Sequence, residues 1–296
     1  MFDTAAVIGT VLLLALAAGA PPDPPGETVV VTGTRLNPAE VHQRATAFVR
    51  ATGVAAGEVL AARWTEPVCP RIVGVTDEAA HLVEAQVRTV AADAGIAAAP
   101  APCAPNMAIV FTPDANTTVQ AMVARTPRRF ARMPAAAVAA LKDGSAPIRW
   151  WSTSEVRDKD GTRSSSEPPP ALGLNGTGSS LPVNEDSSFV QHTNASLVST
   201  ESVRALQFAT VVIDVTRTDG LPLNAVVAYA AIVALAEIRP GAAPPGSVLA
   251  LFSGEVHRSP TAWDLAFLRA LYRLPLDRTA LHQRGRLTGD LAAGIH

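Results

Sequence analysis

Short apolar runs and amphipathic stretches alternate along the chain. Continuous apolar runs at residues 71–75 (RIVGV) and 107–112 (MAIVFT) predict buried strands. Residues 208–216 (FATVVIDVT) are the most strand-like run of all. Apolar positions at helical spacing predict three helices, over residues 37–52, 76–93 and 114–124. This alternation of strands and helices favours an α/β or an α+β domain.

The last third of the chain contains the longest apolar run of the predicted domain. Residues 225–236 (AVVAYAAIVALA) carry no charge and are too few to span a bilayer, so they predict a central helix packed on nearly all sides. Farther on, Thr261 can cap the amide of Asp264, and the Asp264 carboxylate favours the positive end of a helix. A last amphipathic helix is therefore predicted to start there, with Leu265, Leu268, Leu271 and Tyr272 on its buried face.

The middle of the chain is less regular. Residues 135–141 predict a further helix, and residues 147–156 (PIRWWSTSEV) predict an extended segment. Adjacent residues on a strand point to opposite faces, so one of Trp150 and Trp151 is expected inside and the other near the surface. Residues 157–186 are rich in Ser, Gly, Pro and charge, which predicts a disordered surface insertion.

The beginning of the chain is typical of a secreted protein. An apolar run from Ala5 to Ala20 ends in small residues before Pro21, which predicts a signal peptide over residues 1–20. A proline-rich tether over residues 21–38 follows it. A retained membrane anchor and an ordinary buried segment stay open as alternatives, because no Lys or Arg stands near the start. A membrane is a partner only if this segment is retained.

Two cysteines, Cys69 and Cys103, occur in the whole chain, and both lie next to prolines. In an oxidising compartment an isolated pair is most simply a disulfide, whereas in a reducing one the two would be free buried thiols. Closing this loop would stabilise the fold by about 3–4 kcal/mol on a chain-entropy model. Together with the signal peptide, the pair predicts a periplasmic or secreted protein.

Composition and charge narrow the function classes. The chain has 296 residues, of which 48% are hydrophobic and 17% charged, and this excludes a wholly disordered chain. The formal net charge of −2 gives no electrostatic reason to expect nucleic acid as a partner.

The order of the predicted elements resembles the zinc-dependent peptidase architecture called zincin-like, in particular exported bacterial families related to it. The resemblance covers roughly residues 39–275 and is most specific in the C-terminal third, where residues 247–252 (SVLALF) lead to residues 261–274 (TAWDLAFLRALYRL). It implies an α+β fold with a mixed sheet, a long N-terminal helix, a buried central helix and a C-terminal helix. A single domain over residues 39–293 would hold all of them.

The chain departs from that family at the metal site. Zinc hydrolysis needs two histidines one helical turn apart and a glutamate as general base, and no H-E-x-x-H sequence occurs. On the resemblance, Tyr229, Ala230 and Val233 stand at the positions of the first His, the Glu and the second His. None of these side chains can hold or use zinc, so neither a metal nor any other cofactor is expected.

Other sites receive little support from the sequence. The six histidines form no i, i+4 pair, and the remaining candidates for a relocated site, Glu237, His257 and His282, lie on different predicted elements. There is no G-x-S-x-G, Walker or G-x-G-x-x-G motif between a strand and a helix.

The sequence thus predicts an exported, non-catalytic protein of zincin-like fold. Its degenerate active-site cleft would bind a peptide or an envelope protein by strand addition beside residues 208–216, which are taken to be an edge strand. Two alternatives stay open, a hydrolase with an atypical or relocated site and a membrane-anchored structural protein of the envelope.

Overall fold

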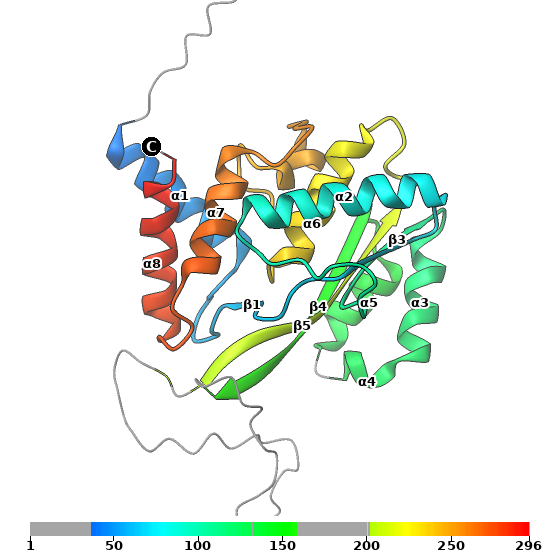
Figure 1. Cartoon of the computed structure of the whole chain (residues 1–296), viewed down its shortest axis with the longest axis horizontal. Helices are drawn as coiled ribbons and strands as arrows, with labels where there is room; N and C mark the ends of the chain where they lie inside the picture. The colour runs from blue at the N-terminus through cyan, green and yellow to red at the C-terminus, as the bar shows by residue number, and fades with distance from the viewer. Residues whose placement is uncertain (1–36, 132, 159–199, 201, 296) are drawn as a thin grey trace, which may run out of the picture. The chain divides into compact units, whose positions relative to one another are not determined.

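A five-stranded mixed sheet lies at the centre of the protein (Figure 1). The computed structural model describes residues 37–131, 133–158, 200 and 202–295. The predicted signal peptide, the tether up to position 36 and the predicted insertion from position 159 onward lie outside the described residues. The strands are β1 (Ala62–Trp64), β2 (Pro70–Val73), β3 (Met107–Thr112), β4 (Ile148–Asp158) and β5 (Ser202–Asp214).

Strand β5 is the central strand of this sheet. Along one side it pairs with β4 in antiparallel register, from Ile148 opposite Ile213 onward. Along its other side it pairs in parallel first with β1 and then with β3, and β2 lies beyond β3. The prediction that residues 208–216 form an edge strand is therefore wrong, because both sides of β5 carry partners. In the described chain β1, β2 and β4 each pair with one strand, and β4, with 11 residues, is the longest of the three.

Helices cover both faces of the sheet. On one face, α2 and α6 pack side by side, and on the other lie α3, α4 and α5 (Figure 1). Trp150 and Trp151 show the division, because the first packs in the α6 layer and the second in the α3 and α5 layer. Both are 7% exposed, so the expectation that one would lie near the surface is wrong. The helices are α1 (Pro38–Thr52), α2 (Asp77–Asp93), α3 (Ala115–Arg125), α4 (Pro127–Phe130), α5 (Ala135–Asp143), α6 (Leu223–Leu235), α7 (Ala262–Arg273) and α8 (Ala280–Ala293), with a 3-10 turn η1 (Val248–Ser253).

Local sequence determines where several helices begin. Asn37 and Glu40 exchange hydrogen bonds through their side chains across the first turn of α1. The same capping box joins Thr261 and Asp264 at α7, and it includes the cap of the Asp264 amide by Thr261 that the sequence predicts. Helix α6 lacks such a cap, and it is stabilised by packing, since every residue from Ala225 to Leu235 is buried. The predicted buried central helix is confirmed.

The disulfide is also confirmed. Cys69 and Cys103 are bonded, with their Cα atoms 6.1 Å apart, and they are separated by 34 positions in sequence. The bond ties the segment before β2 to the loop before β3. In the described part of the chain, no helix is long and apolar enough to cross a bilayer. The coarse prediction of a mixed domain of helices and a sheet is thus confirmed, with parallel strands and one antiparallel strand.

Candidate functional site

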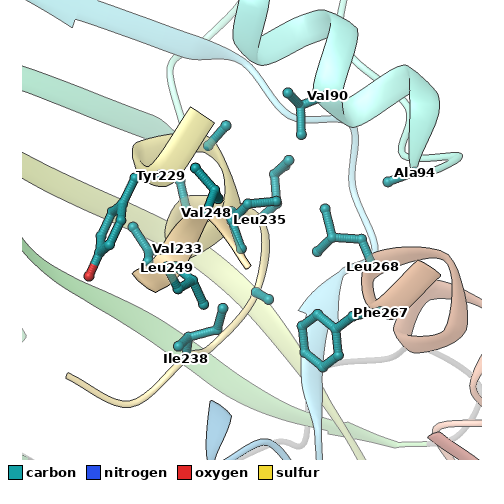
Figure 2. Packing of buried hydrophobic residues seen from close by; sticks show 14 of the residues in the cluster. Val90, Ala94, Tyr229, Val233, Leu235, Ile238, Val248, Leu249, Phe267 and Leu268 are labelled. Atoms are coloured by element: carbon teal, nitrogen blue, oxygen red, sulfur yellow. The ribbon is translucent and has the colours of Figure 1, made fainter. Parts of the chain in front are cut away.

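The three positions expected for metal ligands all lie in the buried stretch of α6. Ala230 and Val233 are core residues with 0% and 2% exposure. Tyr229 is 4% exposed, but Figure 2 shows its hydroxyl pointing away from the labelled core residues, whereas Val233 lies among them. Of the three side chains, only that of Tyr229 carries a polar group.

Tyr229 is the centre of an aromatic cluster formed with Trp150 and Phe252. Its ring meets the ring of Trp150 edge-on at 5.8 Å between centroids, and that of Phe252 at 5.4 Å. The Trp150 indole donates a hydrogen bond of 2.8 Å to the carbonyl of Ile238. This bond holds the Trp150 ring in place in the layer of α6. Phe252 lies on η1 and is 40% exposed, so the aromatic cluster reaches the surface beside β4.

The Tyr229 hydroxyl makes no hydrogen bond to any described residue. Among the described residues, Asn116 Oδ1 is the one side-chain polar atom that is fully buried and has no hydrogen-bond partner. The Tyr229 oxygen has no partner either, so it is not fully buried and solvent reaches it. Burial raises the pKa of Tyr229, so the hydroxyl stays neutral and able to donate at physiological pH. Tyr272 differs, because its hydroxyl donates to the Leu235 carbonyl at 2.7 Å and accepts from the Trp64 amide.

The outer edge of β4 runs beside this cluster. The Asp214 amide donates to the Pro147 carbonyl at 2.9 Å, so the main-chain groups of position 147 face β5. Because these groups alternate in direction along a strand, those of Ile148, Trp150 and Ser152 face away from β5. They make no hydrogen bond within the described residues. This edge therefore offers main-chain donors and acceptors to a further strand.

The candidates for a relocated hydrolase site lie apart and have separate partners. Glu237 is held by Arg204 through two hydrogen bonds of 2.7 and 2.8 Å. His257 contacts the carboxylate of Glu255 at 3.4 Å, and His282 contacts the hydroxyl of Thr279. Within the described residues, no group of three or more His, Cys, Asp or Glu side chains could hold a metal ion.

Asp264 has a structural role that the sequence revealed only in part. Besides capping α7, its fully buried carboxylate accepts hydrogen bonds from the Ser247 hydroxyl and the Val248 amide. It thereby anchors the start of η1, the turn that carries Phe252 of the aromatic cluster. The sequence distance of 17 positions to Ser247 left no local signal for this contact.

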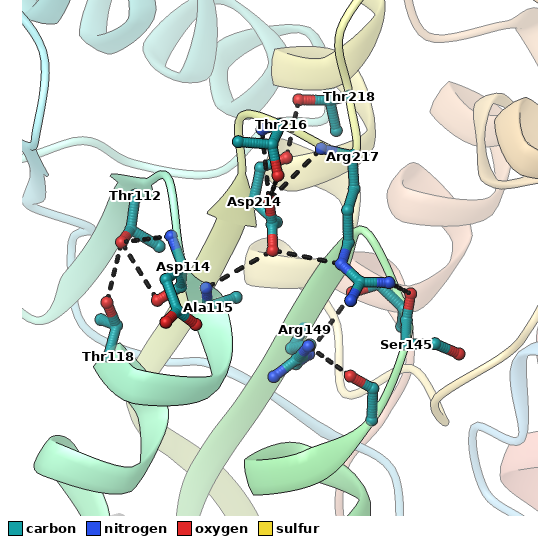
Figure 3. Close-up of polar contacts among 12 residues, drawn as sticks. Thr112, Asp114, Ala115, Thr118, Ser145, Arg149, Asp214, Thr216, Arg217 and Thr218 are labelled. Carbon is teal, nitrogen blue, oxygen red and sulfur yellow. Dashed lines mark hydrogen bonds and ion pairs between the residues drawn. The ribbon is translucent and has the colours of Figure 1, made fainter.

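A second polar network fixes the beginning of β4. Burial opposes ionisation of Asp214, but hydrogen bonds from Thr216, Ala115 and Arg217 hold the pKa of its carboxyl below the usual range. Close by, the buried guanidinium of Arg149 donates to three main-chain carbonyls of the segment that leads into β4. Figure 3 shows both groups enclosed by partners, so this network stabilises the fold and exposes no reactive atom.

Comparison of the chain with protein-family models, with curated proteins and with solved structures finds no match. A functional assignment consequently depends on the geometry of this chain alone.

Proposed function

We propose that this protein is an exported, zincin-like domain without a metal site, which binds an extended peptide or protein segment and does not hydrolyse it. The bound segment lies along the outer edge of β4 and contacts the aromatic cluster of Trp150, Tyr229 and Phe252. The observation that carries the proposal is the solvent-accessible hydroxyl of the otherwise buried Tyr229, which makes no hydrogen bond to a described residue.

The main chain of β4 supplies the sequence-independent part of such binding. Strand addition uses free main-chain groups at a sheet edge, and side-chain pockets add specificity. The edge at Ile148, Trp150 and Ser152 meets this requirement, whereas β5, the strand expected from the sequence, is paired on both sides. The peptide-binding hypothesis therefore moves from residues 208–216 to β4.

The aromatic cluster supplies a surface for one side chain of the ligand. Phe252 exposes part of its ring, and the ring is held in place because η1 is anchored on Asp264. The Tyr229 hydroxyl has no partner among the described residues and is in contact with solvent, so it can donate to an acceptor such as a peptide carbonyl in the bound state. The Tyr229 hydroxyl is thus the expected contact between the aromatic cluster and the ligand.

Binding without hydrolysis follows from the side chains on α6. Ala230 and Val233 offer neither a metal ligand nor a general base, and the Tyr229 phenol is a weak acid whose pKa burial raises further. A relocated site would need Glu237, His257 and His282 to converge, but each of them has a different partner.

A peptide selection tests the proposal directly. The full chain is immobilised and offered a library of short unstructured peptides, and the selected peptides are measured by calorimetry and checked for cleavage by mass spectrometry. We expect intact peptides whose affinity falls about three- to tenfold in Tyr229→Phe, which loses one hydrogen bond. Ser152→Pro should weaken binding as well, because it removes an amide donor that faces away from β5.

Tyr272→Phe is the matched control, since it removes the same atom from a hydroxyl that is bonded inside the fold. It should leave peptide affinity unchanged. Affinity that is insensitive to both Tyr229→Phe and Ser152→Pro would overturn the proposed site, and cleaved peptides would overturn the absence of catalysis.

Elemental analysis separates the proposal from the hydrolase alternative. After zinc loading and dialysis, we expect well below one zinc per chain. About one retained zinc per chain, lost when His257 or His282 is replaced, would contradict the proposal and support a relocated metal site.

A further inference from the structure

We propose that the groove between α1 and α8 is a second binding site, and that it takes a phosphorylated small molecule. None of the residues that line this groove belongs to the aromatic cluster or to β4. It encloses a cavity of about 610 Å³ lined by residues of both helices, of the loop at positions 53–57 and of the segment after α6. Cavities of roughly 300–1,000 Å³ are the usual size for small-molecule sites.

The lining of this groove carries positive charge only. Arg50, Arg239 and Arg284 line it together with His42, and no Asp or Glu is among its lining residues. Within the described residues, none of the three arginines forms an ion pair with a carboxylate. Three arginines without carboxylate partners lie together in one cavity, although the formal net charge of the chain is −2. This local excess of positive charge favours an anion as the ligand.

Two of these guanidinium groups are held in place by main-chain carbonyls. The Arg239 Nε donates to the Ala51 carbonyl at 2.9 Å, and its two terminal nitrogens make no hydrogen bond to the part of the chain that the structure describes. The Arg284 Nη1 donates to the carbonyls of Ala55 and Gly57, at 2.7 and 3.4 Å. Side chains fixed before binding lose less entropy when a ligand arrives.

Gly53 shows how closely the Arg239 stem lies against the end of α1. It ends the helix at φ +76°, and a Cβ atom there would come within 2.9–3.2 Å of the Arg239 methylene carbons. Only glycine combines this backbone conformation with room for the stem. The helix end therefore both terminates α1 and seats one of the three cations.

The side chains favour a phosphate ester as the ligand. Guanidinium forks bind phosphate oxygens through paired hydrogen bonds, and three of them match a dianion better than a single carboxylate. Val54 and Leu281 add apolar surface to the lining, and Leu281 is 64% exposed. This surface suits the organic part of a phosphomonoester rather than a bare inorganic ion.

Calorimetry with defined probes tests this site. Glucose 6-phosphate, inorganic phosphate, citrate and glucose are titrated into the full chain at physiological salt. We expect glucose 6-phosphate to bind more tightly than inorganic phosphate, and citrate and glucose to bind weakly or not at all. Citrate that binds as tightly as glucose 6-phosphate, or no binding of either phosphate, would overturn the assignment.

Two variants place the binding in the groove. Arg50→Gln removes an arginine that makes no hydrogen bond in the described chain, so the fold should be unaffected and affinity should fall about tenfold. Gly285→Leu fills the cavity without changing its charge, and a Cβ atom at this helical position meets nothing within 4 Å. It should abolish binding while the thermal transition stays cooperative.

Arg125→Gln is the matched control, because Arg125 is also an exposed arginine in the last turn of a helix but lies on α3, outside the groove. It should bind glucose 6-phosphate as the unaltered chain does. A loss of affinity as large as in Arg50→Gln would show a general charge effect and would overturn the proposed site, as would unchanged binding in Gly285→Leu.

Discussion

Two buried polar groups on the same side of the sheet, Asp264 and Tyr229, differ in how the fold uses them. The Asp264 carboxylate is fully buried and accepts hydrogen bonds from Ser247, Val248 and Thr261. The Tyr229 hydroxyl accepts none and donates none within the described chain. A polar group whose bonds are all made inside the protein stabilises the fold, whereas one left accessible without a partner is available to a ligand. Mutations should therefore separate the two groups cleanly.

The largest expected effect is on Asp264. Asp264→Ala removes the acceptor for two hydroxyls and two main-chain amides, and leaves the buried donors of Ser247 and Val248 without that partner. We expect the free energy of unfolding to fall by about 3 kcal/mol or more, measured by urea denaturation.

Asp290→Ala is the control for this change. Asp290 lies on α8 and pairs with the exposed Arg286, so its loss should cost about 0.5 kcal/mol or less. Similar losses in both variants would contradict the anchoring role of Asp264.

Asp214 should make the stability depend on acid pH. Asp214→Asn keeps the shape of the side chain but places an amide among donors, and it should cost about 2 kcal/mol at neutral pH. Because the folded-state pKa of this carboxyl is lowered, its stabilising contribution is complete above the unfolded-state pKa and is lost as pH falls through the folded-state pKa.

The difference in unfolding free energy between Asp214→Asn and the unaltered chain should therefore shrink in acid. Urea denaturation at a series of pH values from neutral to strongly acid measures it. A difference that is constant over this range would show that the charge of Asp214 does not stabilise the fold.

The sequence predicts best what depends on neighbouring residues. The Thr261 cap at the start of α7, the buried helix α6 and the Cys69–Cys103 pair all follow from local patterns and composition, and the structure confirms them. The apolar pattern of β5 correctly indicates a strand. The same pattern, however, fits both an edge strand and a central strand of a sheet. The difference is decided by where β1 and β3 pair, which requires tertiary contacts.

Neither proposed site could be predicted from local sequence patterns, and the reason is the same for both. Trp150, Tyr229 and Phe252 come from a strand, a helix and a 3-10 turn that are far apart in sequence. The groove likewise combines Arg50 with Arg239 and Arg284, and no spacing rule joins these positions. Tyr229 did have a sequence signal, because the zincin-like resemblance places it where a metal ligand would stand.

Removing the hydroxyl of Tyr272 or of Tyr229 should change the stability by less than the substitutions of Asp264 and Asp214 do. Tyr272→Phe breaks hydrogen bonds to Leu235 and Trp64, and it should lower the free energy of unfolding by about 1 kcal/mol. Tyr229→Phe removes a hydroxyl that bonds to no described residue, so stability should stay the same or rise slightly. Thermal and urea denaturation of both variants measure the difference, and equal losses would show that the Tyr229 hydroxyl has an internal partner.

The smallest expected effect lies in α8 and is a gain. Gly285→Ala places a methyl group where nothing lies within 4 Å, and the backbone there is helical. Alanine is the better helix former, so the free energy of unfolding should rise by about 0.5–1 kcal/mol. Gly74→Ala is the opposite case, because φ is +87° and the new Cβ would meet the Phe111 carbonyl oxygen. Urea denaturation should give a higher free energy of unfolding for Gly285→Ala, and a lower one for Gly74→Ala, than for the unaltered chain. A loss of stability in Gly285→Ala would mean that the groove beside it is closed in solution, and the phosphate site would then have no room for its ligand.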